Sequence, residues 1–223
     1  MARASRRAWL GGFGAAALAG CAAPPPSAAT PGGALVAAAR RQIGVTTGYD
    51  PAYRVIGYPW GDVPRSAGVC ADVIVRAARD AWRLDLQQLV HEDMTADFAA
   101  YPHRWGLAGP DPNIDHRRVP NLETWWTRHG AVLWRATEKT PGFAFQGGPL
   151  KVGDILTWSS YLGAGSHVAI VSAVGLAPRI VQNLGWGVHE DWLVIQAVAA
   201  ATCHVRWRPE ASAPPKPAAN TML

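Results

Sequence analysis

The chain has 223 residues, of which 21 are Lys or Arg and 16 are Asp or Glu, so its formal net charge is +5. Three of the arginines, Arg3, Arg6 and Arg7, lie within residues 1–21, and without that segment the net charge falls to +2. A nucleic-acid-binding protein is therefore not expected, because the basic excess does not belong to the folded part.

Residues 1–21 are typical of an export signal. The three arginines precede a short apolar stretch, AWLGGFGAAALAG, that is too short to cross a membrane. Its end, Leu18-Ala19-Gly20-Cys21, resembles the lipobox of bacterial lipoproteins, in which the cysteine is lipidated. We therefore expect an exported protein, anchored to a membrane through Cys21 on the periplasmic side of the envelope. An ordinary cleaved signal is the alternative, and residues 5–10 also resemble a twin-arginine signal.

The composition predicts one folded domain between two tails. Residues 22–33 and 210–223 are rich in Pro and Ala, which indicates a flexible tether and a disordered tail. Residues 34–209 remain for a single domain, long enough for one sizeable core. We expect a monomer.

The first half of this domain is expected to be helical. Apolar residues recur at helical spacing in 33–44 and again from Cys70, where about four turns are expected to be half-buried, with Asp72, Arg76 and Arg79 off the apolar stripe. Residues 45–68 are rich in Gly, Pro and Tyr, which predicts a loop or short hairpin. Further helices are expected in 91–102 and at the end of 109–130.

The second half is expected to form strands, because short β-rich runs alternate with turn residues. These runs are 154–158, 167–174, 179–185, 191–198 and 203–208. Helices followed by strands predict an α+β fold, with N-terminal helices packed on a C-terminal antiparallel sheet or half-barrel.

Cys70, His167 and Asn183 are the candidate catalytic residues. A cysteine at a helix start gains about 0.3–1 kcal/mol for its thiolate, which is less than one pKa unit. A neighbouring imidazolium is therefore required for nucleophilic chemistry. His167 opens a strand after a glycine-rich approach, and Asn183 ends the next one, where it can orient the imidazole. The alternatives are a buried, inert Cys70 and a turn role for Asn183.

The order of these motifs resembles a known superfamily. Cys70 on a helix, then VGDILTW and HVAIVS, then a polar residue on the following strand, are similar to the papain-like NlpC/P60 cysteine peptidases. The longer run from YDPAYRVIGYPWGDVP through GVCADVIVRAARD to PDPNIDHRRVPNL is similar to a bacterial family catalogued as domain of unknown function 1287. The resemblance covers residues 35–200.

The resemblance implies a papain-like core with Cys70 as nucleophile, His167 as base and Asn183 as orienter. The expected function is hydrolysis of an amide bond in cell-wall peptide or peptidoglycan, with no cofactor. This chain departs from NlpC/P60 enzymes in having Val69-Cys70-Ala71 in place of Asp-Cys-Ser, and Asn in place of the usual third His. The peptidase substrate therefore does not carry over.

Two sets of residues are candidates for substrate contact. Tyr49 and Tyr58 belong to an aromatic cluster that can line a groove, with core packing as the alternative. Asp115, His116 and Arg117 lie in a polar loop, and Asp115, Arg117 and Arg118 can form loop ion pairs or contact an anionic part of a substrate.

Two rival functions stay open. The first is a metal site, since HEDM (91–94) and Asp115-His116 carry carboxylate and imidazole groups, although without a zinc-type spacing. We expect no metal. The second is a catalytically silent envelope lipoprotein of the same fold that binds wall fragments or a partner. In that case Cys70 is expected to form a disulfide with Cys203 or to be inert.

Overall fold

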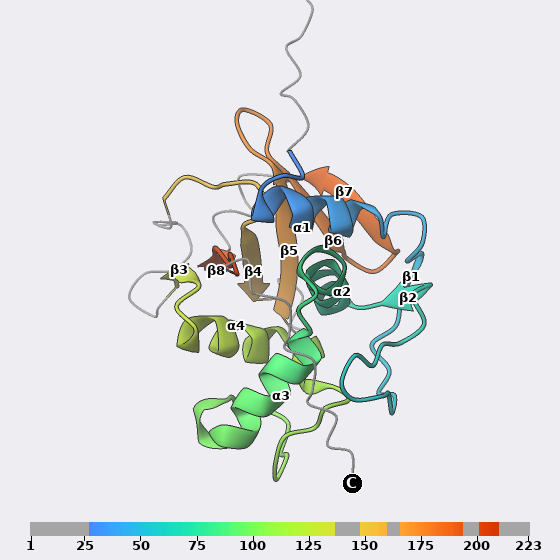
Figure 1. The fold of residues 1–223 in the computed structure, drawn as a ribbon, viewed down its shortest axis with the longest axis vertical. Helices are drawn as coiled ribbons and strands as arrows, with labels where there is room; N and C mark the ends of the chain where they lie inside the picture. The colour runs from blue at the N-terminus through green and yellow to red at the C-terminus, as the bar shows by residue number, and fades with distance from the viewer. Residues whose placement is uncertain (1–26, 137–147, 160–165, 194–200, 210–223) are drawn as a thin grey trace, which may run out of the picture.

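The computed structural model describes residues 27–136, 148–159, 166–193 and 201–209. Within these ranges the helices come first and the main sheet follows (Figure 1). The α+β prediction is confirmed, with antiparallel pairing throughout the main sheet. The expected export signal and the C-terminal tail lie outside the described residues.

Two of the helices begin at a residue whose side chain caps them. Thr30 accepts a hydrogen bond from the Gly33 N–H, and Pro31 occupies the first turn, a favourable beginning for a helix. Asp85 caps a second helix in the same way through the Gln87 N–H. The α-helices are α1 (Pro31–Arg40), α2 (Cys70–Trp82), α3 (Leu86–Ala96) and α4 (Val119–Arg128), and the 3₁₀ turns are η1 (Phe98–Ala100) and η2 (Asp115–Arg117).

The main sheet has the strand order β3-β8-β4-β5-β6-β7. Its strands are β3 (Val132–Arg135), β4 (Ile155–Ser159), β5 (Ser166–Ala173), β6 (Arg179–Asn183), β7 (Val188–Trp192) and β8 (Ala201–Val205). Two short strands, β1 (Gly48–Tyr49) and β2 (Ala67–Gly68), pair in parallel beside the start of α2. The segment 45–68 is therefore not a hairpin.

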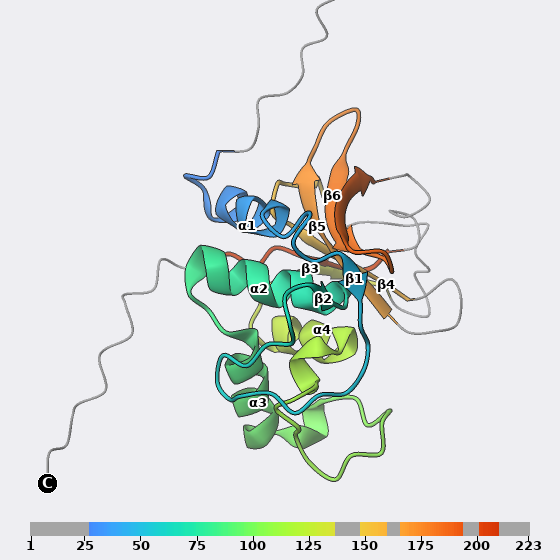
Figure 2. The same ribbon diagram turned by 90° about the vertical axis from the view of Figure 1, so that its right-hand side faces the viewer.

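The two faces of the sheet bury different clusters. Val168 and Ile170 of β5 pack with α1, α2 and α4 in the larger core, which also contains Cys70. The alternate residues Ala169 and Val171 belong to a second cluster with Trp158. This alternation follows from the two-residue period of a strand. Figures 1 and 2 show α1 and α2 lying across the same face of the sheet.

Several boundaries differ from the sequence prediction. The first helix begins at Pro31, inside the stretch expected to be tether, because Thr30 caps it and Pro31 occupies its first turn. Gly32 lies so close to the Val152 carbonyl that a Cβ at this position would meet that oxygen. The third helix begins at Leu86 and not at residue 91, and strand β3 was not predicted. The strand predicted over 191–198 is β7, displaced to 188–192, and residues 194–198 lie outside the described part.

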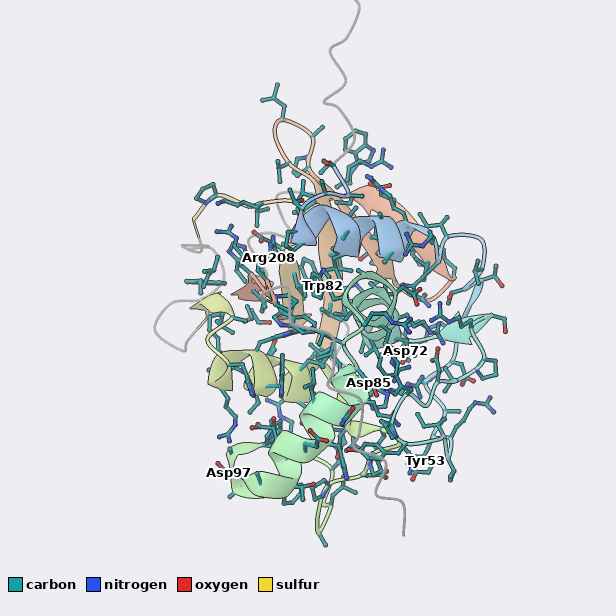
Figure 3. The ribbon with its side chains drawn as sticks, in the orientation of Figure 1. Tyr53, Asp72, Trp82, Asp85, Asp97 and Arg208 are labelled. Carbon is teal, nitrogen blue, oxygen red and sulfur yellow. The ribbon has the colours of Figure 1, made fainter. Side chains whose placement is uncertain are left out.

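The charged side of α2 is buried, which corrects the expectation of a half-exposed helix. Asp72, Arg76 and Arg79 are at most 5% exposed. Each has a charged partner brought from another segment: Arg117 for Asp72, Asp62 for Arg76 and Asp85 for Arg79. Figure 3 shows Asp72 and Asp85 on the inner side of the loops that cover this helix. Pairing offsets the cost of burying these charges.

Candidate active site

Cys70 is the first residue of α2, directly after the extended Val69. The Asp72 carboxylate accepts a hydrogen bond from the Val69 N–H at 2.6 Å, which fixes the turn into the helix. The first N–H groups of a helix have no partner within it, and the helix dipole is positive there. The sulfur therefore lies where a negative charge is favoured.

The thiol nevertheless stays protonated, because it is only 3% exposed. Burial raises the pKa of Cys70, although hydrogen bonds from the N–H groups of Val168 and Ala71 oppose this rise. The Tyr49 hydroxyl is a hydrogen-bond partner of the sulfur, and burial together with Cys70 raises the pKa of Tyr49 to about 12. Tyr49 is therefore a neutral donor at physiological pH.

An ion pair ties the start of α2 to two loops. Arg117 lies 3.0 Å from Asp72, and both side chains are almost fully buried. The same guanidinium donates to the carbonyl oxygens of Asp50 and Ala52, in the segment after β1. Arg117 thus holds Cys70, Tyr49 and η2 together.

Cys70 lines a pocket of about 400 Å³. Tyr49, Ser166 and Val119 contribute to its wall, and the Sγ atom lies 4.0 Å from the Ser166 carbonyl oxygen at the start of β5. The remaining lining residues are Pro51, Val69, Arg104, Trp105, Ile114, Arg117, Arg118 and Pro120. The Cys70 thiol thus lies in the wall of a cavity that is large enough for part of a small peptide.

His167 follows Ser166 on the same strand but projects from the alternate face. Its imidazole contacts Trp158, with ring centroids 5.6 Å apart, and its Nε2 lies 2.8 Å from Oε1 of Gln182. Since an amide oxygen only accepts, Nε2 carries the proton and Nδ1 is the basic nitrogen. Burial lowers the pKa of His167, while the bond to Gln182 raises it. The Cys70 sulfur and the His167 imidazole therefore lie on opposite faces of the sheet at the start of β5.

Asn183 does not contact His167, so the orienting role predicted for it is wrong. Its amide donates to the carbonyl oxygens of Gly48 and Gly68, and its oxygen accepts from the N–H groups of Gly185 and Gly187. It fastens β1 and β2 to β6, with Tyr49 and Cys70 close by in the chain. The orienting contact is made by Gln182, one residue earlier.

The other predicted contact residues divide into two groups. Tyr49 and Arg117 line the Cys70 pocket. Tyr58, Asp115 and His116 do not. Tyr58 packs edge-on against His91, and His116 is buried, which lowers its pKa to about 3. Asp115 accepts from the Asp111 N–H and pairs with Arg118.

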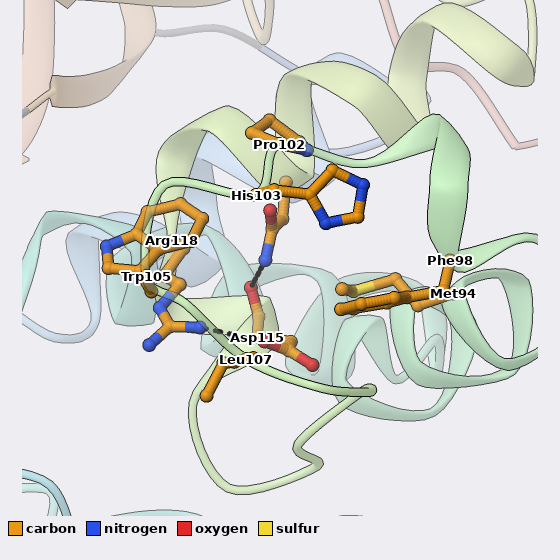
Figure 4. A pocket seen from close by; sticks show the side chains of 9 residues that line it. Met94, Phe98, Pro102, His103, Trp105, Leu107, Asp115 and Arg118 are labelled. Carbon is orange, nitrogen blue, oxygen red and sulfur yellow. Dashed lines mark hydrogen bonds and ion pairs between the residues drawn. The ribbon is translucent and has the colours of Figure 1, made fainter.

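Asp115 and Arg118 also line a small neighbouring pocket of about 10 Å³, together with Trp105 (Figure 4). Arg118 and Trp105 are shared with the Cys70 pocket, so they form the wall between the two. Arg104 and Trp105 had not been predicted, since an exposed turn of this composition carries no distinctive signal. Gln182 was missed because a one-residue difference in register decides which polar residue faces His167.

The described residues also bear on the metal site and on the disulfide that the rival functions predict. No group of three His, Cys, Asp or Glu residues within the described ranges is close enough to hold a metal ion. Cys70 and Cys203 are both free thiols, and burial raises the pKa of Cys203 to about 12. None of the helices in the described part has the length and apolar character that a bilayer crossing requires.

Comparison with known proteins gives a family and a curated relative. A family described as a domain of unknown function, DUF1287, matches residues 36–207. The chain is 48% identical over 155 residues to a protein of Escherichia coli (strain K12) named Uncharacterized protein YijF, an alignment that covers 68% of this chain and 71% of that protein. No solved structure was found to match the chain. Neither description names an activity, so function has to be argued from the site.

Proposed function

This chain belongs to the DUF1287 family, and we propose that it is a cysteine hydrolase that cleaves an amide bond in cell-wall peptide or peptidoglycan. The observation that carries the proposal is the placement of Cys70. Its thiol lies at the positive end of a buried helix, in the wall of a pocket of about 400 Å³, beside a tyrosine hydroxyl. A nucleophile, an anion-stabilising helix end and space for a substrate thus coincide.

The reaction follows the chemistry of thiol acyl transfer. The Cys70 proton passes to Nδ1 of His167, and the sulfur adds to the substrate carbonyl carbon. The Cys70 N–H and the Tyr49 hydroxyl donate to the oxyanion. His167 then protonates the leaving nitrogen as the C–N bond breaks, which leaves a thioester. Water, activated by the same imidazole, releases the acid and restores the thiol.

Gln182 sets the tautomer that this step requires. With Nε2 held by the amide oxygen at 2.8 Å, Nδ1 is the nitrogen that can accept a proton. The imidazole lies on the far side of the start of β5 from the sulfur. With the Gln182 contact kept, the proton passes between the sulfur and Nδ1 through a bridging water. The catalytic set is therefore Cys70, His167 and Gln182, with Asn183 as a positioning residue.

The test is digestion of purified peptidoglycan by the protein, with the released fragments weighed by mass spectrometry. We expect Cys70→Ala and His167→Ala each to abolish fragment release. Cys203→Ala, which removes the other thiol of the fold, is the matched control and is expected to retain activity. Release by Cys70→Ala at the wild-type rate would overturn the proposal.

The wider assignment rests on resemblance. A cysteine at a helix start, a histidine on a strand and an amide side chain on the next strand follow the order of the papain-like NlpC/P60 core. The lipobox-like residues 18–21 support lipidation at Cys21 and attachment to a membrane on the periplasmic side. An envelope location would bring the pocket to cell-wall peptide.

A second candidate function is a catalytically silent lipoprotein that binds wall fragments or a partner. The buried, protonated thiol and the position of the His167 imidazole on the opposite face of β5 favour it. Iodoacetamide labelling near neutral pH separates the two. Faster modification of Cys70 than of Cys203 is expected of the hydrolase, since Cys70 opens onto a pocket while Cys203 is fully buried. Equally slow labelling of both would favour the silent form.

A further inference from the structure

We infer that Arg104 and Arg118 form an anion subsite in the Cys70 pocket, so that the substrate is an acidic peptide with a carboxylate near the cleaved amide. This inference rests on the proposed function and names its substrate class. The charge of the pocket wall is the starting observation. Three arginines line it, and within the described residues no aspartate or glutamate does.

The three arginines are not equivalent. Arg117 is committed to Asp72 and to two backbone carbonyl groups, which leaves it a structural role. Arg118 is bound to Asp115 through Nη1 only, and its guanidinium lies 4.2 Å from the centre of the Trp105 ring. Figure 4 shows this guanidinium lying against the indole, with the Asp115 bond at one side. The stacking fixes its plane while other N–H groups remain for a ligand.

Arg104 supplies the excess charge. It is exposed, lines the same pocket and has no ion-pair partner in the described part of the chain. The ion pairs with Asp72 and Asp115 already balance Arg117 and Arg118. Tyr49 adds no negative charge, since it stays protonated. The pocket is therefore left with a positive potential beside the sulfur.

A carboxylate is the ligand that this arrangement fits. A planar guanidinium fixed by stacking presents paired donors to two oxygens, and a second, mobile arginine can close on the same group. An acidic residue adjoining the scissile amide would be drawn to this wall while its carbonyl carbon meets the sulfur. A neutral peptide leaves the positive charge uncompensated.

The first experiment uses the reactivity of Cys70 itself. The rate of alkylation by iodoacetate, an anion, is divided by the rate with neutral iodoacetamide, and the quotient is compared with that of free N-acetylcysteine. We expect the quotient to exceed the free-thiol value and to fall about fivefold in Arg104→Gln and in Arg118→Gln, as loss of one nearby charge predicts. Added salt should reduce it in the wild type. Arg128→Gln, which removes a charge outside the pocket, is the control.

A second measurement needs no reactive thiol. Calorimetric titration of Cys70→Ala with acetyl-Ala-Glu-Ala and with acetyl-Ala-Gln-Ala compares two peptides that differ by one charge. We expect about fivefold tighter binding of the glutamyl peptide, lost on adding Arg104→Gln. Equal affinities, or an alkylation quotient unchanged in both arginine variants, would overturn the subsite. Charge preference without peptidoglycan cleavage would refute the hydrolase alone, and cleavage without charge preference would refute the subsite alone.

Discussion

Two neighbouring residues, Gln182 and Asn183, have opposite tasks because a strand sends successive side chains to opposite faces. Gln182 shares its face with His167 and meets its imidazole. Asn183 shares its face with Val181, which belongs to the larger core, and makes four hydrogen bonds to backbone groups. The first residue belongs to the chemistry and the second to the framework around it.

Exchanging each residue for alanine should separate these tasks. Asn183→Ala leaves buried carbonyl and N–H groups without partners and is expected to lower the free energy of unfolding by about 3 kcal/mol. Gln182→Ala should cost less stability but should lower kcat and shift the pH profile of cleavage, since His167 loses the contact that sets its tautomer. Urea denaturation and peptidoglycan digestion measure the two effects. The same stability loss in both variants would contradict this division.

At the scale of the element, α2 depends on partners from far along the chain. Its polar side is covered by Asp62, Asp85 and Arg117, which neutralise the charges it buries. The Asp72–Arg117 pair also joins the helix start to the loop that follows β1, the strand that carries Tyr49. The position of the nucleophile is therefore set by an ion pair that does not take part in the reaction.

Asp72→Ala and Asp80→Ala test this dependence on one helix. Removing Asp72 leaves the buried Arg117 charge uncompensated and is expected to cost about 3–5 kcal/mol. Asp80 pairs with Arg65, whose side chain is 46% exposed, so its loss should cost less than about 1 kcal/mol. Thermal and urea unfolding of the two variants gives the comparison. Similar losses would show that burial of the Asp72 pair contributes nothing.

The sequence allowed α2 to be predicted from its apolar period and Cys70 to be placed at its start. The burial of its charged side could not be predicted, because the partners of Asp72, Arg76 and Arg79 lie in loops whose paths are fixed only by tertiary contacts. The α+β order followed from the change in period along the chain. The orienting residue was missed, since the register of β6 against β5 was not encoded in the spacing of RIVQN alone.

At the scale of the whole molecule, Asp154 holds residues 204–208 against the start of β4. Its carboxylate accepts from His204, Arg206 and Arg208, and also from the Lys151 N–H. Burial raises the pKa of Asp154, but the bonds from His204 and Arg206 outweigh it and bring the pKa down to about 2. The ionised form is thus favoured by the fold.

This lowered pKa predicts the acid sensitivity of the protein. A carboxylate whose pKa is lower in the folded than in the unfolded state stabilises the fold above the unfolded pKa, near 4, and loses that effect as the pH falls toward 2. We expect Asp154 to account for about 2 kcal/mol of the loss over this range. Urea unfolding between pH 6 and pH 2 measures it. Asp154→Asn should show a shallower decline, whereas Asp97→Asn, at an exposed position, should follow the wild type.

The place of β8 in the sheet has a consequence for biosynthesis. Among the described strands β8 is the last in the chain, yet it lies between β3 and β4 and is the neighbour that pairs with β3 in the sheet. Before β8 is in place, the facing edges of β3 and β4 have unpaired backbone N–H and C=O groups. Such edges can pair with strands of other chains. A chain that stops before residue 201 therefore lacks the strand that pairs with β3 and leaves the edges of β3 and β4 open.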